Sequence, residues 1–131
     1  MRISRELFDD MVAHARSDAP NECCGIVASQ DGEARRVYRA TNVEASPLKF
    51  VMDPRDQVRA STEIEDDGLD LAAIYHSHTR TAPYPSQTDI NFARDWPGVL
   101  WIIVGLAGDD AEVRTYEIRD GQVAEAELTV S

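Results

Sequence analysis

The feature that most constrains the fold is an almost uninterrupted apolar stretch from Val99 to Leu106. This stretch is as long as a strand and far shorter than the roughly 18 apolar residues that a membrane-spanning helix needs. It also lacks the alternation of apolar and polar residues that is typical of a half-exposed strand. We therefore expect a central strand that is buried on both faces of a sheet, with other elements covering both sides.

The segments around this strand alternate between helical and extended patterns. Ser4 is a predicted N-cap, and the apolar residues from Ile3 to Ala15 recur at helical spacing before Pro20 ends the helix. Further helices are predicted after Asp53 and after Ser86. The predicted strands cover residues 23–29, 34–40, 69–77, 99–106, 112–119 and 122–130. The fold class is therefore α+β, or mixed α/β, around one mixed sheet, and 131 residues fit a single domain, residues 1–131.

The charge of the chain limits the partners that it can bind. It has 24 acidic and 13 basic residues, a formal net charge of −11, and its basic residues are scattered along the sequence. Binding to nucleic acid or to an anionic membrane needs clustered positive charge, so neither is expected as a partner. Because residues 1–6 turn acidic at once and contain no apolar segment, we expect no secretory signal and a cytoplasmic location.

The two cysteines are neighbours in the sequence, Cys23 and Cys24. Adjacent residues of a strand point to opposite faces, so these two cannot form an unstrained disulfide. With no other cysteine in the chain, a disulfide framework and a four-cysteine zinc site are both excluded. We expect both to be small buried residues of a strand.

The main chemical signal is the sequence His76-Ser77-His78 at the end of a predicted strand. Alternate strand residues share a face, so the two imidazoles lie side by side. Asp89 starts the next helix and can add an oxygen ligand, and two histidines with one carboxylate leave a fourth zinc position for water. A bare His-x-His is also common as ordinary core or surface histidines, and Ser86 with Asp89 also fits a helix capping box.

An acidic residue, Glu22, precedes the first long strand and is expected at the same sheet end as His76. A carboxylate there can take a proton from water and return it to a leaving amine. Taken alone, Glu22 is more simply read as a solvated residue at a strand end.

Together these residues resemble the motif of the JAMM metallopeptidases, also called MPN-plus proteins. That motif is an upstream Glu, then His-Ser/Thr-His, seven residues, Ser, two residues and Asp. Glu22, the histidine pair, Thr79 to Pro85, Ser86 and Asp89 match it without a gap. The resemblance implies a single curved mixed sheet flanked by helices, the MPN/JAMM fold, which is cytidine-deaminase-like in architecture.

The resemblance also implies a role for each site residue. Three of them, His76, His78 and Asp89, would bind one zinc ion per chain. Glu22 would be the general base and acid, and Ser86 would stabilise the oxyanion. The elementary chemistry agrees, because zinc lowers the pKa of water and a hydroxyl donor stabilises the negative charge of a tetrahedral intermediate.

The residues around Glu22-Cys23-Cys24-Gly25 are most similar to short bacterial Mec-type members of this family. These imply a peptidase that removes cysteine from the C-terminal Gly-Gly of a ubiquitin-like sulfur-carrier protein, in cysteine biosynthesis. The alternative is a general isopeptidase that removes ubiquitin-like proteins from conjugates, and a third reading is a non-catalytic MPN scaffold. A metallo-β-lactamase-like site is disfavoured, because Thr79-Arg80-Thr81 stands where such a site continues into an Asp-His pair. A zinc deaminase site is disfavoured, because it needs later cysteines and none follows Cys24.

Overall fold

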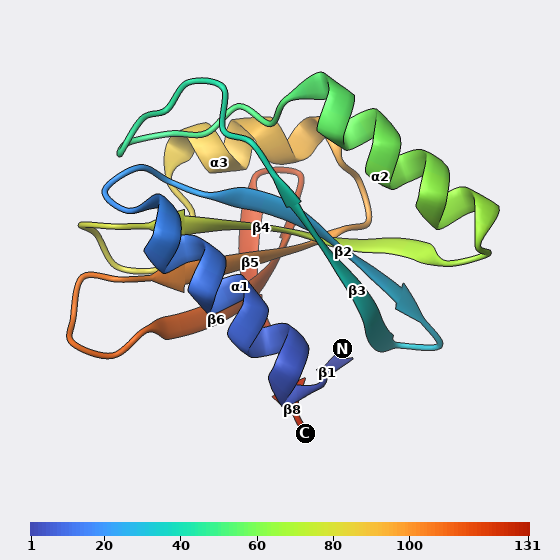
Figure 1. The fold of residues 1–131 in the computed structure, drawn as a ribbon. Coiled ribbons are helices and arrows are strands. Elements are labelled where there is room, and N and C mark those ends of the chain that lie inside the picture. Colours follow the sequence, from blue (N-terminus) through green and yellow to red (C-terminus); the bar gives the residue numbers. More distant parts are fainter.

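A computed structural model describes residues 1–131, and its main element is a mixed sheet with helices on both faces (Figure 1). The helices are α1 (Arg5–Asp18), α2 (Pro54–Asp66), α3 (Gln87–Phe92) and the short 3-10 helix η1 (Ala93–Asp95). The strands are β1 (Arg2–Ile3), β2 (Cys24–Gln30), β3 (Glu33–Ala40), β4 (Asp70–His78), β5 (Leu100–Gly105), β6 (Glu112–Arg119), β7 (Gln122–Ala126) and β8 (Thr129–Val130). The expected fold class is therefore confirmed.

The eight strands lie in the order β7-β6-β5-β4-β2-β3-β1-β8. Strand β4 is antiparallel to β2 and parallel to β5, so the sheet is mixed at its centre. Strands β7 and β8 are at opposite ends of this order, yet only Glu127 and Leu128 separate them in the chain. The sheet therefore curls until its two outer strands approach each other, and both chain termini lie there (Figure 1).

The two faces of the sheet carry separate apolar cores. Within β5, Trp101 and Ile103 belong to the core under α2 and α3, whereas Ile102 and Val104 belong to the core under α1. All four side chains are at most 1% exposed, which confirms the prediction of a strand buried on both faces. In this way β5 and its neighbour β4 form the centre of the sheet between two helical layers.

The helix starts follow the local sequence. The hydroxyl of Ser4 accepts a hydrogen bond from the Leu7 N–H, and the carboxylate of Asp53 accepts one from the Arg55 N–H. Both side chains thereby satisfy backbone donors that an uncapped helix would leave unpaired. The predicted starts of α1 and α2 are confirmed.

The structure corrects the predictions at both ends of the chain. Ile3, assigned to the helical stripe, lies in the two-residue strand β1. The strand predicted over residues 122–130 is interrupted after Ala126, because Thr129 and Val130 pair with β1 rather than with β6. His14 lies off the predicted apolar stripe of α1, yet it is buried, with 5% of the residue exposed. None of the helices is both long and apolar enough to cross a membrane.

Candidate metal centre

The candidate site lies where β4 ends, on the face covered by α2 and α3. Ile74 belongs to the core of that face, and the alternation of the strand brings His76 and His78 to the same side. Tyr75 belongs to the core of the opposite face. Both imidazoles are buried, at 0% and 5% exposure. The sequence prediction that the two rings share a face is confirmed.

Three polar atoms converge on one point. The distance from His76 Nε2 to His78 Nε2 is 3.2 Å, and Asp89 Oδ2 lies 3.1 Å from the first and 3.2 Å from the second. Ligands about 2.0–2.1 Å from a tetrahedral zinc ion lie roughly 3.3 Å from one another, by geometry. The triangle therefore has the size that three ligands of one such ion require.

The hydrogen-bond partners of His78 suit a metal ligand. Its Nδ1 lies 3.0 Å from the carbonyl oxygen of Ala82, which can only accept, so Nδ1 carries the proton. In a neutral ring, Nε2 then presents a lone pair to the Asp89 carboxylate. Two acceptors at this separation need a proton or a metal ion between them, and one metal ion can bind all three converging atoms.

Helix α3 holds Asp89 in place through its first turn. The hydroxyl of Ser86 accepts a hydrogen bond from the Asp89 N–H at 3.1 Å, and the Ser86 N–H donates to Asp89 Oδ2 at 3.0 Å. This is the capping box that the sequence predicted. The carboxylate is thereby oriented toward the histidines, while Ser86 itself remains exposed beside them.

Glu22 reaches the same histidines from the segment just before β2. One of its carboxylate oxygens lies within 4.8 Å of a ring nitrogen of His76 and of His78. Only 4% of the residue is exposed, and its buried Oε1 has no hydrogen-bond partner. A buried polar atom without a partner is costly, which points to a ligand or water molecule that completes the site.

Burial and local charge set the ionisation of these groups. Burial raises the pKa of Glu22 to about 7, although His78 acts to lower it. Burial would also raise the pKa of Asp89, but its close contacts with His76 and His78 lower it well below its usual range. Complete burial lowers the pKa of His76. Asp89 is therefore a carboxylate near neutral pH, whereas Glu22 can gain or lose a proton there.

Other residues that position the site were not found from the sequence. The hydroxyl of Ser77, on the opposite face of β4, accepts a hydrogen bond from the Cys23 N–H at 2.8 Å. The Asn42 side chain donates to the Glu22 carbonyl at 3.0 Å, and the Phe50 ring stacks on His76 with centroids 4.7 Å apart. Only Ser77 lies inside the motif. A loop Asn or Phe gives no such signal in one sequence.

Comparison with known proteins identifies the family. Residues 4–119 match the family described as prokaryotic homologs of the JAB domain. The chain belongs to this JAB-domain family. The predicted family is thereby confirmed, and the polar groups at the end of β4 lie within the matched region.

Two relatives have named activities. The CysO-cysteine peptidase of Mycobacterium tuberculosis is 38% identical over 131 residues, which cover 98% of this JAB-domain chain and 89% of that protein. The probable TtuB-protein conjugate cleaving protease of Thermus thermophilus is 37% identical over 92% of this chain and 77% of its own length. Both names describe cleavage of a protein or its adduct.

Solved structures show the same fold. A protein from Desulfitobacterium hafniense, with 32% identity, superposes with a TM-score of 0.89 over 99% of this chain and 92% of that one. A JAB1/MPN domain protein from Archaeoglobus fulgidus, with 23% identity, superposes with a TM-score of 0.68 over 99% and 98%. The expected MPN architecture is therefore confirmed.

Proposed function

We propose that this JAB-domain protein is a zinc-dependent peptidase that hydrolyses the amide bond after the C-terminal Gly-Gly of a ubiquitin-like sulfur-carrier protein and releases cysteine. The observation that carries the proposal is the convergence of His76, His78 and Asp89 beside the buried carboxyl of Glu22. The similarity to the mycobacterial CysO-cysteine peptidase supports the choice of substrate.

In this proposal His76, His78 and Asp89 hold one zinc ion per chain. When bound, zinc supplies Lewis-acid chemistry, because it lowers the pKa of water and polarises an amide carbonyl. The Glu22 carboxylate takes the proton of the attacking water and returns it to the leaving amine. Its position beside both histidines and its pKa of about 7 suit that exchange.

Ser86 is proposed to stabilise the oxyanion. Its hydroxyl oxygen accepts from the Asp89 N–H, which leaves the hydroxyl proton free to donate to the developing negative charge. The residue is exposed at the rim of the site, where a substrate carbonyl can reach it. The same side chain therefore caps α3 and takes part in the reaction.

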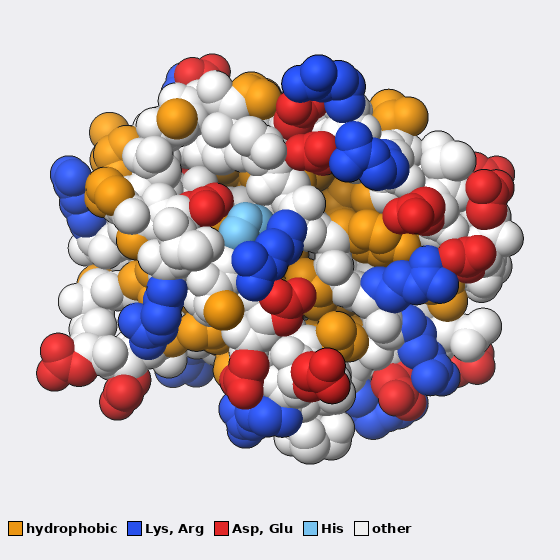
Figure 2. Space-filling model, in the orientation of Figure 1, with side chains coloured by type: hydrophobic (Ala, Val, Ile, Leu, Met, Phe, Trp, Pro, Cys, Tyr) orange, Lys and Arg blue, Asp and Glu red, His pale blue; other side chains and the backbone are white.

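The proposed partner is a flexible Gly-Gly tail rather than a folded surface. Glycines have no side chain, so such a tail can bring its backbone close to His76 and His78, which are buried. Nucleic acid is not proposed as a partner, since charges of both signs are interspersed on the face shown in Figure 2 and the net charge is −11. We also propose a cytoplasmic location, where free thiols such as those of Cys23 and Cys24 persist.

A second candidate function is cleavage of ubiquitin-like proteins from lysine side chains of conjugates. The relative from Thermus thermophilus, named as a protein conjugate cleaving protease, favours it. The chemistry at Glu22 and the histidines would be the same, and only the leaving group would differ. A non-catalytic scaffold is less well supported, because all five polar residues of the motif are present.

The test is mass spectrometry of a small sulfur-carrier protein that carries cysteine after Gly-Gly. We expect its mass to fall by one cysteine residue when it is incubated with the zinc-loaded protein, and to stay constant with the Glu22→Gln variant. A parallel incubation contains the same carrier linked through Gly-Gly to a lysine side chain. Cleavage of the lysine conjugate with an intact cysteine adduct would replace the proposal with the second candidate.

A further inference from the structure

Residues 79–85 lead from His78 toward helix α3 and have no regular structure. This segment must nevertheless keep His78 Nε2 and Asp89 Oδ2 about 3 Å apart. Two strands outside the segment contact it at Pro83. The hydroxyl of Tyr116, on β6, donates a hydrogen bond to the Pro83 carbonyl at 2.5 Å. The Pro83 ring packs on Gly105, at the end of β5, so closely that an added Cβ would lie 2.9 Å from Pro83 Cδ.

The neighbouring residues extend this contact on both sides. The Tyr84 ring meets the Tyr116 ring edge to face, with centroids 5.5 Å apart. On the other side of Pro83, the Ala82 carbonyl accepts the proton of His78 Nδ1. One peptide unit thus separates the carbonyl held by Tyr116 from the carbonyl that fixes the tautomer of His78.

We propose that Tyr116 is a positioning residue for the metal centre. By holding Pro83 it places the Ala82 carbonyl against His78 Nδ1, so that Nε2 presents its lone pair to the ion. Groups that orient a metal-bound histidine through its second nitrogen govern metal affinity and ring orientation. This inference rests on the proposed metal site, but its first step, control of the His78 tautomer, does not require a metal.

The Tyr116 hydroxyl is the part of the residue that this role needs. The ring packs with the core under α2 and α3, and only 6% of the residue is exposed. A phenylalanine would keep that packing and lose only the hydrogen bond to Pro83. Tyr116→Phe therefore separates the positioning role from the contribution of the ring to the core.

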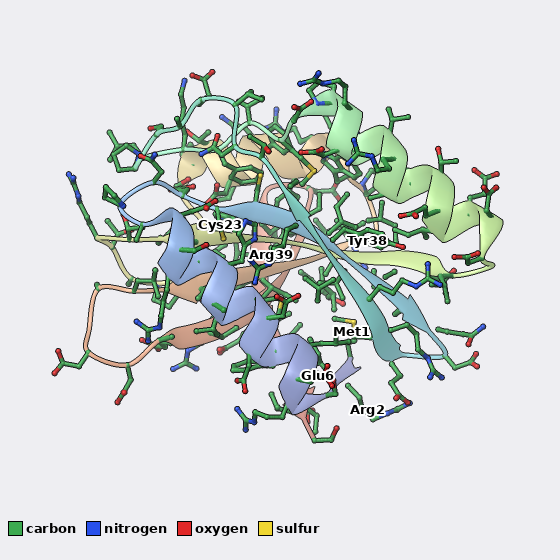
Figure 3. The ribbon with its side chains drawn as sticks, in the orientation of Figure 1. Met1, Arg2, Glu6, Cys23, Tyr38 and Arg39 are labelled. Carbon is green, nitrogen blue, oxygen red and sulfur yellow. The ribbon has the colours of Figure 1, made fainter.

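A matched control is available on β3. The Tyr38 hydroxyl accepts a hydrogen bond from the Arg36 side chain at the surface, 3.1 Å away. In Figure 3 Tyr38 lies well away from Cys23, which follows Glu22 and directly precedes β2. Tyr38→Phe removes the same oxygen atom from the same residue type and leaves residues 79–85 untouched.

The experiment measures the His78 tautomer by long-range ¹H–¹⁵N NMR in the metal-free protein and zinc affinity by competition with a chelator. We expect Tyr116→Phe to populate both His78 tautomers and to weaken zinc binding by roughly tenfold, with a changed cobalt(II) absorption spectrum. Tyr38→Phe should match the wild type in all three. Gly105→Ala places a methyl group against the Pro83 ring and should displace it, so this variant should reproduce the Tyr116→Phe result. It tests the same contact if the Tyr116→Phe protein folds poorly.

A Tyr116→Phe protein with the wild-type tautomer and with zinc affinity within twofold of the wild type overturns the inference. If the wild-type protein itself takes up no zinc, the proposed function fails. The tautomer measurement then still decides whether Tyr116 positions His78.

Discussion

The two faces of β4 carry equally buried polar groups that differ in whether they have partners. On the face toward α1, the Tyr75 hydroxyl and His14 Nδ1 are 2.7 Å apart, and His14 Nε2 lies 3.3 Å from Asp18. On the same face the Ser77 hydroxyl accepts from the Cys23 N–H. On the opposite face, His76 Nδ1 and Glu22 Oε1 are buried without partners, and ring nitrogens of both histidines converge on one Asp89 oxygen.

Along β4 this difference separates structural polar residues from the candidate site. Buried polar groups that satisfy one another hold elements together, as His14 and Tyr75 join α1 to β4. Buried polar groups without partners cost stability unless something absent from the chain completes them. Burial and residue type alone would not distinguish His14 from His76, because both are nearly inaccessible to solvent.

Removal of a proposed ligand should have the largest effect on turnover. His78→Ala should lose zinc and lower turnover of the carrier–cysteine adduct by about ten-thousandfold or more, because both the ion and its chemistry are lost. Metal analysis and mass spectrometry on the same preparation measure the two effects. Treatment of the wild type with a chelator should reproduce this loss, and added zinc should restore activity. Full turnover by a metal-free sample would contradict the assignment.

Replacement of the proposed base should separate chemistry from metal binding. Glu22→Gln keeps the size of the side chain and removes its capacity to take a proton, so we expect a loss of roughly a thousandfold in turnover. The zinc content should remain near one ion per chain. If zinc disappears together with activity, Glu22 is a ligand and its assignment as the base is wrong.

Ser86 has a structural and a proposed chemical role, and Ser86→Ala measures both. Loss of the cap of α3 should lower the free energy of unfolding by about 1 kcal/mol. Loss of an oxyanion donor should lower turnover by roughly a hundredfold. We expect both changes, with chemical denaturation and initial rates as the measurements. A destabilised variant with nearly full activity would leave Ser86 with the cap alone.

The smallest effect on turnover is expected on the face toward α1. Tyr75→Phe leaves His14 Nδ1 without its buried partner, so the free energy of unfolding should fall by about 1–3 kcal/mol. Zinc content and turnover should stay within twofold of the wild type, because the lost contact lies on the far side of β4. A large loss of zinc would show that the two faces are coupled more closely than their hydrogen bonds indicate.

Much of this arrangement could be predicted from local patterns. The alternation of a strand places His76 and His78 together, and Ser86 with Asp89 forms a capping box whether or not it serves a reaction. The central strand β5 followed from its continuous apolar sequence. These predictions depend on neighbours within a few residues, where periodicity and capping rules apply.

The remaining features depend on contacts between distant parts of the chain. His14 finds its partner 61 residues away, so its polar side chain gave no sign of burial. The role of Ala82 lies in a backbone carbonyl, which every residue type shares. Strands β1 and β8 have two residues each, too few to produce a recognisable pattern.

The pairing of β1 with β8 has a consequence for the order of folding. Arg2 aligns with Thr129 and Ile3 with Val130, so this contact joins residues about 127 positions apart. Ordering so long a loop has a high entropic cost, and such contacts slow folding when they must form early. During synthesis β1 cannot meet β8 until residues 129–130 have left the ribosome. By that time β2, β4 and β5 can already be paired, so the site should assemble before the curled sheet brings its outer strands together.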